Sequence, residues 1–349
     1  MALRRKNRIA WAGAWHYAHN NPRYEELIPR LTNVDRYYVR LPRFWPARGV
    51  LRRIWLPLLV RWLGLRYPLL FTADWRAIGT VRARVVIDHD DPVFSAPELA
   101  ALNLPNVAAV VATTDLVRRN LKEAGVRSPI EVIPQGVATG LVNLDSAHEI
   151  RRRFSRSPEE IVVGLHQPHF DFASELQAGS TEQMYAVDQL LEAMEAAHQK
   201  NPRLVLWLVG RPSAGVTSYA ASNPWIRLIG YQPRPSLMDY VSCFDIGVYP
   251  RTLDLKGRSS VKVLEYMACG VPVVGFNVDE MNVVEQARAG IVANGTPAFS
   301  AALLSLAEDP NRRKQMGVLG MKAAAAYDWK ILAEKYCALL EEWSNRENQ

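Results

Sequence analysis

Short apolar runs alternate with stretches of helical periodicity in the first half of the chain. A short apolar run between turn residues predicts a buried strand, and apolar residues three and four positions apart predict a helix. The predicted strands comprise residues 8–12, 36–41, 69–72, 85–88, 107–112 and 130–133. The predicted helices between them comprise residues 24–31, 50–63, 96–102 and 115–124. Strands separated by helices indicate a parallel sheet with helices on its faces.

A second series of the same kind follows a polar stretch. Residues 138–158 hold few apolar positions beyond Ile150 and Phe154, which predicts a linker with a short helix. The strands predicted after it comprise residues 161–165, 204–209, 226–229, 246–249, 271–274 and 290–292. The longer predicted helices comprise residues 184–199, 235–243, 297–307, 310–326 and 329–343. A chain of 349 residues with this pattern suits two α/β domains.

Composition narrows the class of protein. Hydrophobic residues make up 49% of the chain, which is enough to form real cores. Cys243, Cys269 and Cys337 form no C-x-x-C pair, and this usage is typical of reduced thiols rather than of a disulfide framework or a zinc site. The charged opening lacks a sustained apolar core, so we expect no signal peptide and a cytoplasmic protein.

The formal net charge of +7 could reflect an acidic partner. We find no helix-turn-helix, RNP-type aromatics or zinc finger, so we expect no nucleic-acid partner. Arginine mixes with Trp and Leu in residues 40–66, where Pro57 and Arg61 interrupt an apolar run too short to span a bilayer. This pattern favours peripheral binding to an anionic membrane surface. A buried interface helix with Arg stems along its edge is the alternative.

The most informative stretch is residues 259–275, S-S-V-K-V-L-E-Y-M-A-C-G-V-P-V-V-G. It predicts a short helix that contains Lys262 and ends at Gly270, with Pro272 beyond it. Small residues precede this helix, so its free N–H groups can approach a ligand, and together with Lys262 they suit a diphosphate. Glu265, one turn further, can accept hydrogen bonds from sugar hydroxyls. An ordinary strand–helix–strand unit is the alternative interpretation.

This stretch resembles the donor-binding motif of the retaining GT-B glycosyltransferases of family 4, also called group 1. Members often read S-P-x-K-L-x-E-Y-M-A-x-G-K-P-V-V at this point. The matching positions are Ser259, Lys262, Glu265, Tyr266, Met267, Ala268, Gly270, Pro272, Val273 and Val274.

The resemblance is clear over residues 85–136 and 204–343 and implies an α/β fold of the GT-B type. That fold has two Rossmann-like parallel-sheet domains facing a cleft: residues 1–145 on the acceptor side and 146–328 binding the nucleotide sugar. A C-terminal helix, residues 329–349, returns to the first domain. The implied activity is transfer of a sugar from a nucleotide sugar to a glycan, lipid-linked or small-molecule acceptor in polysaccharide or glycolipid biosynthesis. The anomeric configuration is retained, and neither a metal nor another cofactor is required.

The resemblance also assigns roles to single residues. The helix start and Lys262 hold the diphosphate, Glu265 holds the ribose, and the loop containing Tyr231 holds the base. The Gly of the first strand–helix turn lies near the phosphates, and arginines supply further positive charge. The donor-binding residues expected on this basis are Gly13, Arg211, Tyr231, Arg258, Ser259, Ser260, Val261, Lys262 and Glu265.

Residues 88–91, D-H-D-D, follow a β-branched run and therefore end a parallel strand, at the edge where open α/β sheets bind ligands. Three interpretations compete. In the first, V-V-I-D-H resembles the V-x-T-x-H of the family, which makes His89 a catalytic residue facing the donor sugar. In the second, the acidic turn caps a helix over residues 92–99. In the third, an Asp-x-Asp pair binds a metal, which the metal-independent family disfavours.

Two departures from the family pattern stand out. The family has a second Glu, separated by seven residues from the one at Glu265, and Gly257 occupies that position. It also has an Arg after the first strand of the second domain, where this chain has Leu165. Asp254 could reach in from the Gly257 loop. The departures leave open an altered donor, or a degenerate, non-catalytic GT-B scaffold or membrane-assembly partner. A GT-B epimerase or phosphorylase is a further alternative, although no pyridoxal-phosphate lysine signature is present.

Overall fold

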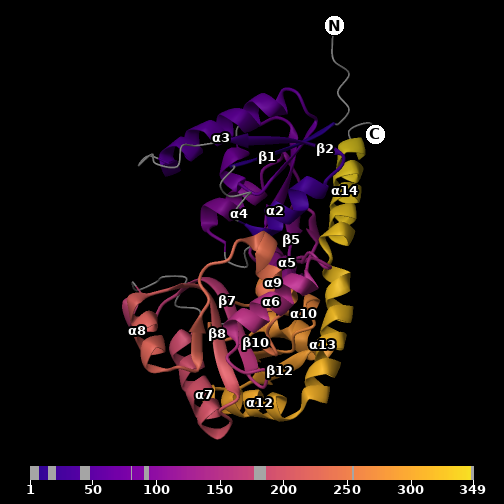
Figure 1. Cartoon of the computed structure of the whole chain (residues 1–349). Coiled ribbons are helices and arrows are strands. Elements are labelled where there is room, and N and C mark those ends of the chain that lie inside the picture. Colours follow the sequence, from indigo (N-terminus) through magenta and orange to yellow (C-terminus); the bar gives the residue numbers. More distant parts are fainter. Residues whose placement is uncertain are drawn as a thin grey trace. The chain divides into compact units, whose positions relative to one another are not determined.

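The computed structural model describes residues 8–14, 21–39, 48–79, 81–89, 94–176, 186–253 and 255–346. The chain divides into two compact units (Figure 1). Unit 1 comprises Met1–Gly136, Lys256–Ser259 and Tyr327–Gln349, and unit 2 comprises Val137–Leu255 and Ser260–Ala326. Each unit contains a six-stranded sheet, and every strand pairing is parallel. The predicted fold class is therefore confirmed.

The sheet of unit 1 has the order β2-β1-β3-β4-β5-β6. Its strands are β1 (Ile9–Ala14), β2 (Val34–Val39), β3 (Leu69–Thr72), β4 (Arg84–His89), β5 (Val107–Ala112) and β6 (Ile130–Val132). The helices of this unit are α2 (Pro22–Leu27), α3 (Arg48–Gly64), α4 (Ala96–Leu102), α5 (Asp115–Glu123) and α14 (Trp329–Asn345). The helix predicted over residues 24–31 divides into α2 and a 3-10 turn, because Pro29 lacks the N–H that would continue the helix.

The sheet of unit 2 has the order β12-β11-β10-β7-β8-β9. Its strands are β7 (Ile161–Phe170), β8 (Leu204–Pro212), β9 (Ile226–Leu228), β10 (Ile246–Tyr249), β11 (Val273–Phe276) and β12 (Gly290–Ala293). Its helices are α6 (Leu144–Phe154), α7 (Val187–Lys200), α8 (Ala214–Ser222), α9 (Arg234–Val241), α10 (Val261–Ala268), α11 (Asn282–Ala287), α12 (Thr296–Glu308) and α13 (Pro310–Ala324). Helix α8 was not predicted, since its small and polar residues show no helical period.

The two faces of the unit 2 sheet are packed differently. Alternate residues of β7 and β8, such as Val163 and Leu206, form a buried core with α7 and α12, which lie side by side in Figure 1. On the other face, Gly164 and Gly247 leave room for aromatic rings. A Cβ on Gly247 would lie 2.7 Å from Cγ of Tyr266, so this glycine lets α10 pack closely on β10. Packing of its ring on β10 therefore accounts for Tyr266, which is one of the residues that match the motif.

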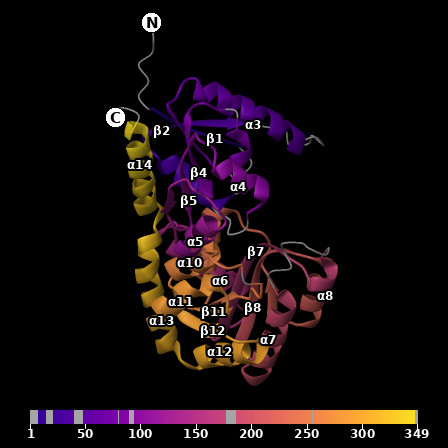
Figure 2. The same ribbon diagram turned by 180° about the vertical axis from the view of Figure 1, so that it is seen from behind.

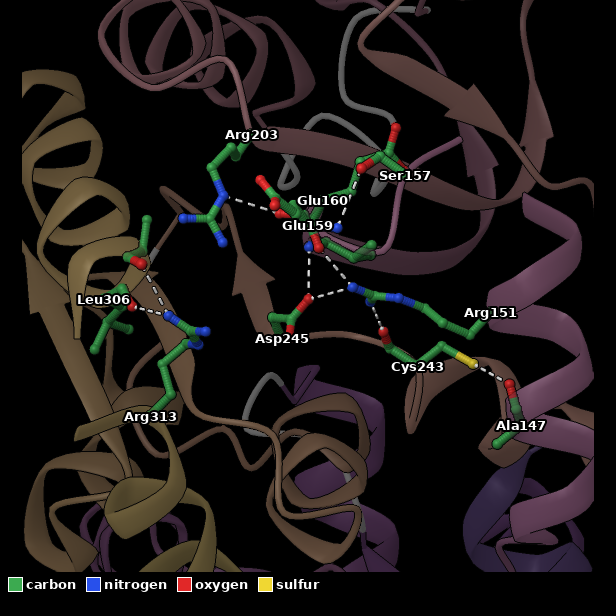
Figure 3. Close-up of polar contacts among 12 residues, drawn as sticks. Ala147, Arg151, Ser157, Glu159, Glu160, Arg203, Cys243, Asp245, Leu306 and Arg313 are labelled. Atoms are coloured by element: carbon green, nitrogen blue, oxygen red, sulfur yellow. Dashed lines mark hydrogen bonds and ion pairs between the residues drawn. The ribbon is translucent and has the colours of Figure 1, made fainter. Parts of the chain in front are cut away.

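A polar network fixes α6 near the start of β7 (Figure 3). Arg151 of α6 donates from Nη2 to Asp245 Oδ2 at 2.8 Å and to the carbonyl of Glu160 at 2.7 Å. Asp245 Oδ2 also accepts from the backbone N–H of Val162 at 2.7 Å. Asp245 directly precedes β10, so the network joins the amino ends of two neighbouring strands to α6. Its role is structural, because ligands of open α/β sheets bind at the carboxyl ends.

Unit 1 contains a fully buried guanidinium. Arg23 of α2 is 0% exposed and contacts both carboxylate oxygens of Asp88, from Nε at 2.8 Å and from Nη2 at 3.0 Å. The hydroxyl of Tyr336 on α14 donates to Asp88 Oδ1 at 2.8 Å, and carbonyls of Ile133 and Pro134 accept from the same guanidinium. This cluster joins β4, α2 and the C-terminal helix (α14 in Figure 2), which packs on α2 and β3.

We expect Asp88→Ala to destabilise unit 1 severely, because it leaves a buried positive charge without its carboxylate. Breaking such a buried pair costs about 3–5 kcal/mol of unfolding free energy, to be measured by urea denaturation. Glu342→Ala is the matched control, since it removes an exposed partner of Arg346 on α14 and should cost less than about 1 kcal/mol. Equal effects of the two substitutions would contradict the central role of the cluster.

Candidate functional site

The sheet of unit 2 reverses its strand order next to β7. The chain adds β8 and β9 on one side of β7 and then places β10 on the other side. Open α/β sheets bind ligands at the carboxyl ends of the strands beside such a reversal. The register between β7 and β8 shifts between His166 and His169, which is a local irregularity of the kind that redirects side chains near binding sites. The candidate site is therefore expected where β7 and β10 end.

Four buried polar side chains meet at this edge. They are His166 and Gln167 of β7, and Lys262 and Glu265 of α10, each at most 8% exposed. Lys262 Nζ lies 3.4 Å from Gln167 Oε1 and 5.9 Å from the ring centroid of Tyr249 at the end of β10. The sequence brings Lys262 and Glu265 together because positions three apart share one face of a helix.

The start of α10 has the form expected for an anion site. Ser260 is the N-cap but makes no side-chain capping hydrogen bond, and no acidic residue lies in the first turn. Val261 and Lys262 are the first helical residues. A helix start that its own N-cap serine does not cap, and that has a lysine beside it, favours a negatively charged ligand.

Glu265 lies between a cation and an imidazole. Its Oε1 is 2.7 Å from Nη2 of Arg234, and its Oε2 is 3.4 Å from Nε2 of His166. Burial, followed by the charges of Lys262 and Arg234, holds the pKa of His166 well below its usual value. The imidazole is therefore neutral, and within the described part of the chain its buried Nε2 has no hydrogen-bond partner. Neither Arg234 nor His166 was predicted from the sequence, because neither belongs to the matched motif.

Arg211 and Tyr231, both predicted to bind the donor, lie together. The Arg211 guanidinium is stacked 4.0 Å from the ring centroid of Tyr231, whose side chain is 48% exposed. Arg211 lies near the end of β8, and Tyr231 follows β9 and Gly230, which has a φ of 82°. This stacked pair presents an aromatic face and a cation at the same edge of the sheet.

Other predicted residues are distributed between the units. Ser260 and Val261 begin α10 in unit 2, whereas Arg258 and Ser259 belong to the Lys256–Ser259 segment of unit 1. Gly13 is the last but one residue of β1 in unit 1, where a Cβ would lie 2.1 Å from the ring of Trp11. That close approach explains the glycine by packing alone.

The structure explains both departures from the family pattern. Gly257 has a φ of 84°, a Cβ there would lie 3.0 Å from Val117 Cγ2, and its carbonyl accepts from Thr114 Oγ1 at 2.9 Å. This backbone excludes a Glu without rearrangement. Leu165 is fully buried in the core of unit 2. The Leu165 side chain therefore contributes to folding. Asp254, which the sequence suggested as a residue reaching in from the Gly257 loop, lies outside the described residues.

His89, predicted to be catalytic, ends β4 and is 4% exposed. Its Nδ1 lies 3.2 Å from Glu98 Oε1 on α4. Its Nε2 is buried, and among the described residues it has no hydrogen-bond partner. A carboxylate on one ring nitrogen orients the imidazole and leaves the other nitrogen for a ligand.

The residues of the D-H-D-D turn do not act as one group. The Asp88 carboxylate is occupied by Arg23 and Tyr336, so it is not a metal ligand as one interpretation required. The helix begins at Ala96 with Ser95 as its N-cap, and Glu98 accepts from the Ser95 N–H, so the acidic turn does not cap it. Asp90 and Asp91 lie outside the described residues. Within the described ranges, no cluster of three or more His, Cys, Asp or Glu could hold a metal ion.

Residues 176–309 match the family model of the group 1 glycosyl transferases. A D-inositol 3-phosphate glycosyltransferase of Segniliparus rotundus is 24% identical over 239 residues, which cover 64% of this chain and 50% of the relative. The chain thus spans about half the length of this relative. The expected resemblance to group 1 glycosyltransferases is confirmed.

Solved structures agree on the fold. The sucrose-phosphate synthase of Thermosynechococcus elongatus superposes with a TM-score of 0.73 at 17% identity, covering 96% of this chain and 98% of the other. HepE of Anabaena, crystallised with UDP and glucose, gives 0.69 at 17% identity, covering 96% and 99%. At 17% identity, these superpositions establish that this chain has the GT-B fold.

We expect the depressed pKa of His166 to make stability depend on pH. The unfolded chain binds a proton at His166 near its ordinary pKa of about 6.5, whereas the folded chain resists protonation. The contribution is therefore complete above about pH 6.5 and decreases as the pH falls below that value. Relative to His166→Gln, the wild-type unfolding free energy should fall by up to about 1.4 kcal/mol per pH unit in that window. If the unfolding free energies of the wild type and His166→Gln, measured by denaturation, change equally with pH below about 6.5, the prediction is wrong.

Proposed function

We propose that this chain is a retaining GT-B glycosyltransferase that transfers a sugar from a nucleoside-diphosphate sugar, without a metal or other cofactor. The observation that carries the proposal is the buried polar cluster of Lys262 and Glu265 at the start of α10, next to the strand-order reversal of unit 2. Relatives named as glycosyltransferases and a neighbour of the same fold crystallised with UDP and glucose support it.

Departure of the diphosphate is the demanding step of such a transfer. Negative charge builds on the leaving group, and the N–H groups of the α10 start together with Lys262 would stabilise it. Lys262 is suited to this because it is buried, so its charge acts through a poorly screened environment. Fixed positive charge of this kind supplies what a metal ion supplies in other transferases.

Glu265 would hold the ribose of the donor. Its contact with Arg234 fixes the carboxylate but does not exhaust it, since two carboxylate oxygens offer about four lone-pair positions. Ribose hydroxyls could therefore donate to Glu265 while Arg234 stays in place. The stacked pair of Arg211 and Tyr231 is suited to the base.

His89 would position the donor sugar and stabilise the positive charge of an oxocarbenium-like state. The contact of Nδ1 with Glu98 supports this role, because the buried Nε2, which has no hydrogen-bond partner among the described residues, would accept from a sugar hydroxyl. The proposed role needs no proton transfer by His89, and a retaining enzyme does not require a base on this residue to release the leaving group.

The proposed partner beyond the donor is an anionic membrane on its cytoplasmic face. Helix α3 is apolar on two sides: Leu56, Val60 and Leu63 are buried, and the opposite side is open. The outer α3 face is formed by large residues of the helix and of the turn directly after it that are 43–78% exposed, namely Ile54, Trp55, Leu58, Trp62 and Leu65. Such a concentration of exposed aromatic and aliphatic side chains is typical of an interaction surface.

Positive charge beside the outer α3 face favours a lipid surface over an apolar protein partner. Arg61 and Arg66 are exposed, and the Arg66 guanidinium lies 3.8 Å from the ring centroid of Trp62. Trp at the headgroup level and arginines against anionic lipid suit a helix that lies on the membrane. No helix in the described residues is long and apolar enough to cross a bilayer. An acceptor that is lipid-linked, rather than a free glycan or small molecule, fits this surface best.

The proposed activity predicts that the purified chain releases a nucleoside diphosphate from one member of a panel of UDP-, GDP-, ADP- and dTDP-sugars, while the sugar passes to the hydroxyl or phosphate of an added lipid-linked acceptor or, more slowly, to water. Product release and NMR of the sugar anomer measure turnover and retention, and EDTA should not reduce the rate. Lys262→Ala should lower turnover by about ten-fold or more, since a charge-assisted hydrogen bond contributes roughly 1.5–3 kcal/mol. Binding without turnover for the whole panel would favour a non-catalytic scaffold, and a rate restored only by Mg²⁺ or Mn²⁺ would overturn metal independence.

The proposed membrane surface predicts binding to vesicles that contain phosphatidylglycerol, weakened by salt and absent for neutral phosphatidylcholine. The pair Arg61→Glu and Arg66→Glu should weaken binding more than ten-fold, since each Arg near the surface contributes about 1 kcal/mol. Trp55→Ser with Leu58→Ser should weaken it as well. Val318→Ser with Leu319→Ser on α13, which removes apolar residues of comparable exposure, is the matched control. If neither pair of substitutions weakens vesicle binding, the outer α3 face is not the membrane-binding surface.

A further inference from the structure

Arg234 is the first residue of α9, and its position there is electrostatically unusual. A helix start carries partial positive charge, so a cation at that end is unfavourable unless an anion lies nearby. The first turn of α9 contains no acidic residue of its own. The same holds for α10, where Lys262 is the second helical residue and no acidic residue lies in the first turn. Two neighbouring helices of unit 2 therefore both begin with a cation.

Both cations lie close to Glu265, Arg234 by direct contact and Lys262 by its position three residues earlier on α10. The Arg234 side chain is 27% exposed, yet its Nη2 reaches Oε1 of Glu265, whose side chain is only 2% exposed. This contact brings the guanidinium to Glu265 of α10, which lies three residues after Lys262. Of these three charged groups two are positive, so the group as a whole carries an excess of positive charge.

His166 provides an independent indication that a ligand binds here. Its side chain is 7% exposed, and Nε2 lies 3.4 Å from Glu265 Oε2 but has no hydrogen-bond partner among the described residues. Both Lys262 and Arg234 act on this imidazole, because after burial their charges are the causes that lower its pKa. The two cations therefore lie within electrostatic reach of the same buried ring.

We propose that Arg234 binds the diphosphate of the nucleotide sugar together with Lys262, and that Glu265 holds it in position for this. The inference rests on the proposed function, since it names a further residue of the same donor site. A guanidinium has five N–H donors in a planar fork, and this geometry suits the adjacent oxygens of a diphosphate. A merely structural Arg234 would instead anchor Glu265 and affect the whole nucleotide alike.

Calorimetry with a nucleoside diphosphate and its nucleoside separates these roles. UDP, GDP, ADP and dTDP are first titrated into the wild type, and the tightest binder is compared with its own nucleoside. Arg234→Ala should lower the affinity for the diphosphate by roughly ten-fold or more and the affinity for the nucleoside by less than about three-fold. Arg234→Lys, which keeps the charge but loses the fork, should lie between, and the salt dependence of diphosphate binding should decrease in Arg234→Ala.

Arg152→Ala is the matched control, because it removes an exposed arginine of the same unit on α6. It should leave both affinities unchanged. Equal losses for diphosphate and nucleoside in Arg234→Ala would show that Arg234 only anchors Glu265, and an unchanged diphosphate affinity would exclude it from the site. If the wild type binds none of the four diphosphates, the proposed function fails together with this inference. Circular dichroism of each variant establishes that it is folded, and Arg234→Lys provides the test if Arg234→Ala is not.

Discussion

A charge that leaves water must find a partner, and this constraint organises both units. In unit 1 the guanidinium of Arg23 is fully buried, and it is held by Asp88, by Tyr336 and by carbonyls that follow β6. In unit 2 the carboxylate of Glu265 is buried beside Arg234 and Lys262. The first cluster is saturated by the protein itself and stabilises the fold, whereas the second has more positive than negative charge and suits an anionic ligand.

The same distinction separates two residues that are adjacent in the sequence. Asp88 and His89 both end β4, and alternation along the strand sends their side chains to opposite faces. Asp88 enters the Arg23 cluster and loses its freedom to bind anything else. His89 contacts Glu98 and keeps a buried nitrogen without a partner in the described structure. One position therefore serves stability, and the next is suited to a ligand.

The departures from the family motif have local physical causes. At Gly257 a positive φ and the proximity of Val117 require a residue without a side chain. At position 165 the side chain points into the core between β7 and its helices, where a leucine packs and an arginine would be buried without a partner. Neither change removes a group from the Lys262–Glu265 cluster. An altered donor site is thus a simpler interpretation than a degenerate one, and Arg234 becomes relevant as a cation supplied from another element.

The sequence by itself determined the two α/β halves, nearly all of the strands and the placement of Lys262 and Glu265 on one short helix. Short β-branched runs and the spacing of the motif are local properties, and they survive folding unchanged. It could not show that Arg234 and His166 join Glu265, because those residues come from α9 and β7 and meet only when the sheet places β10 beside β7. Nor could it show which side of α3 stays exposed, since the helix is apolar on both sides. Only packing against the sheet decided that Leu56, Val60 and Leu63 face inward while Trp55 and Trp62 face the solvent.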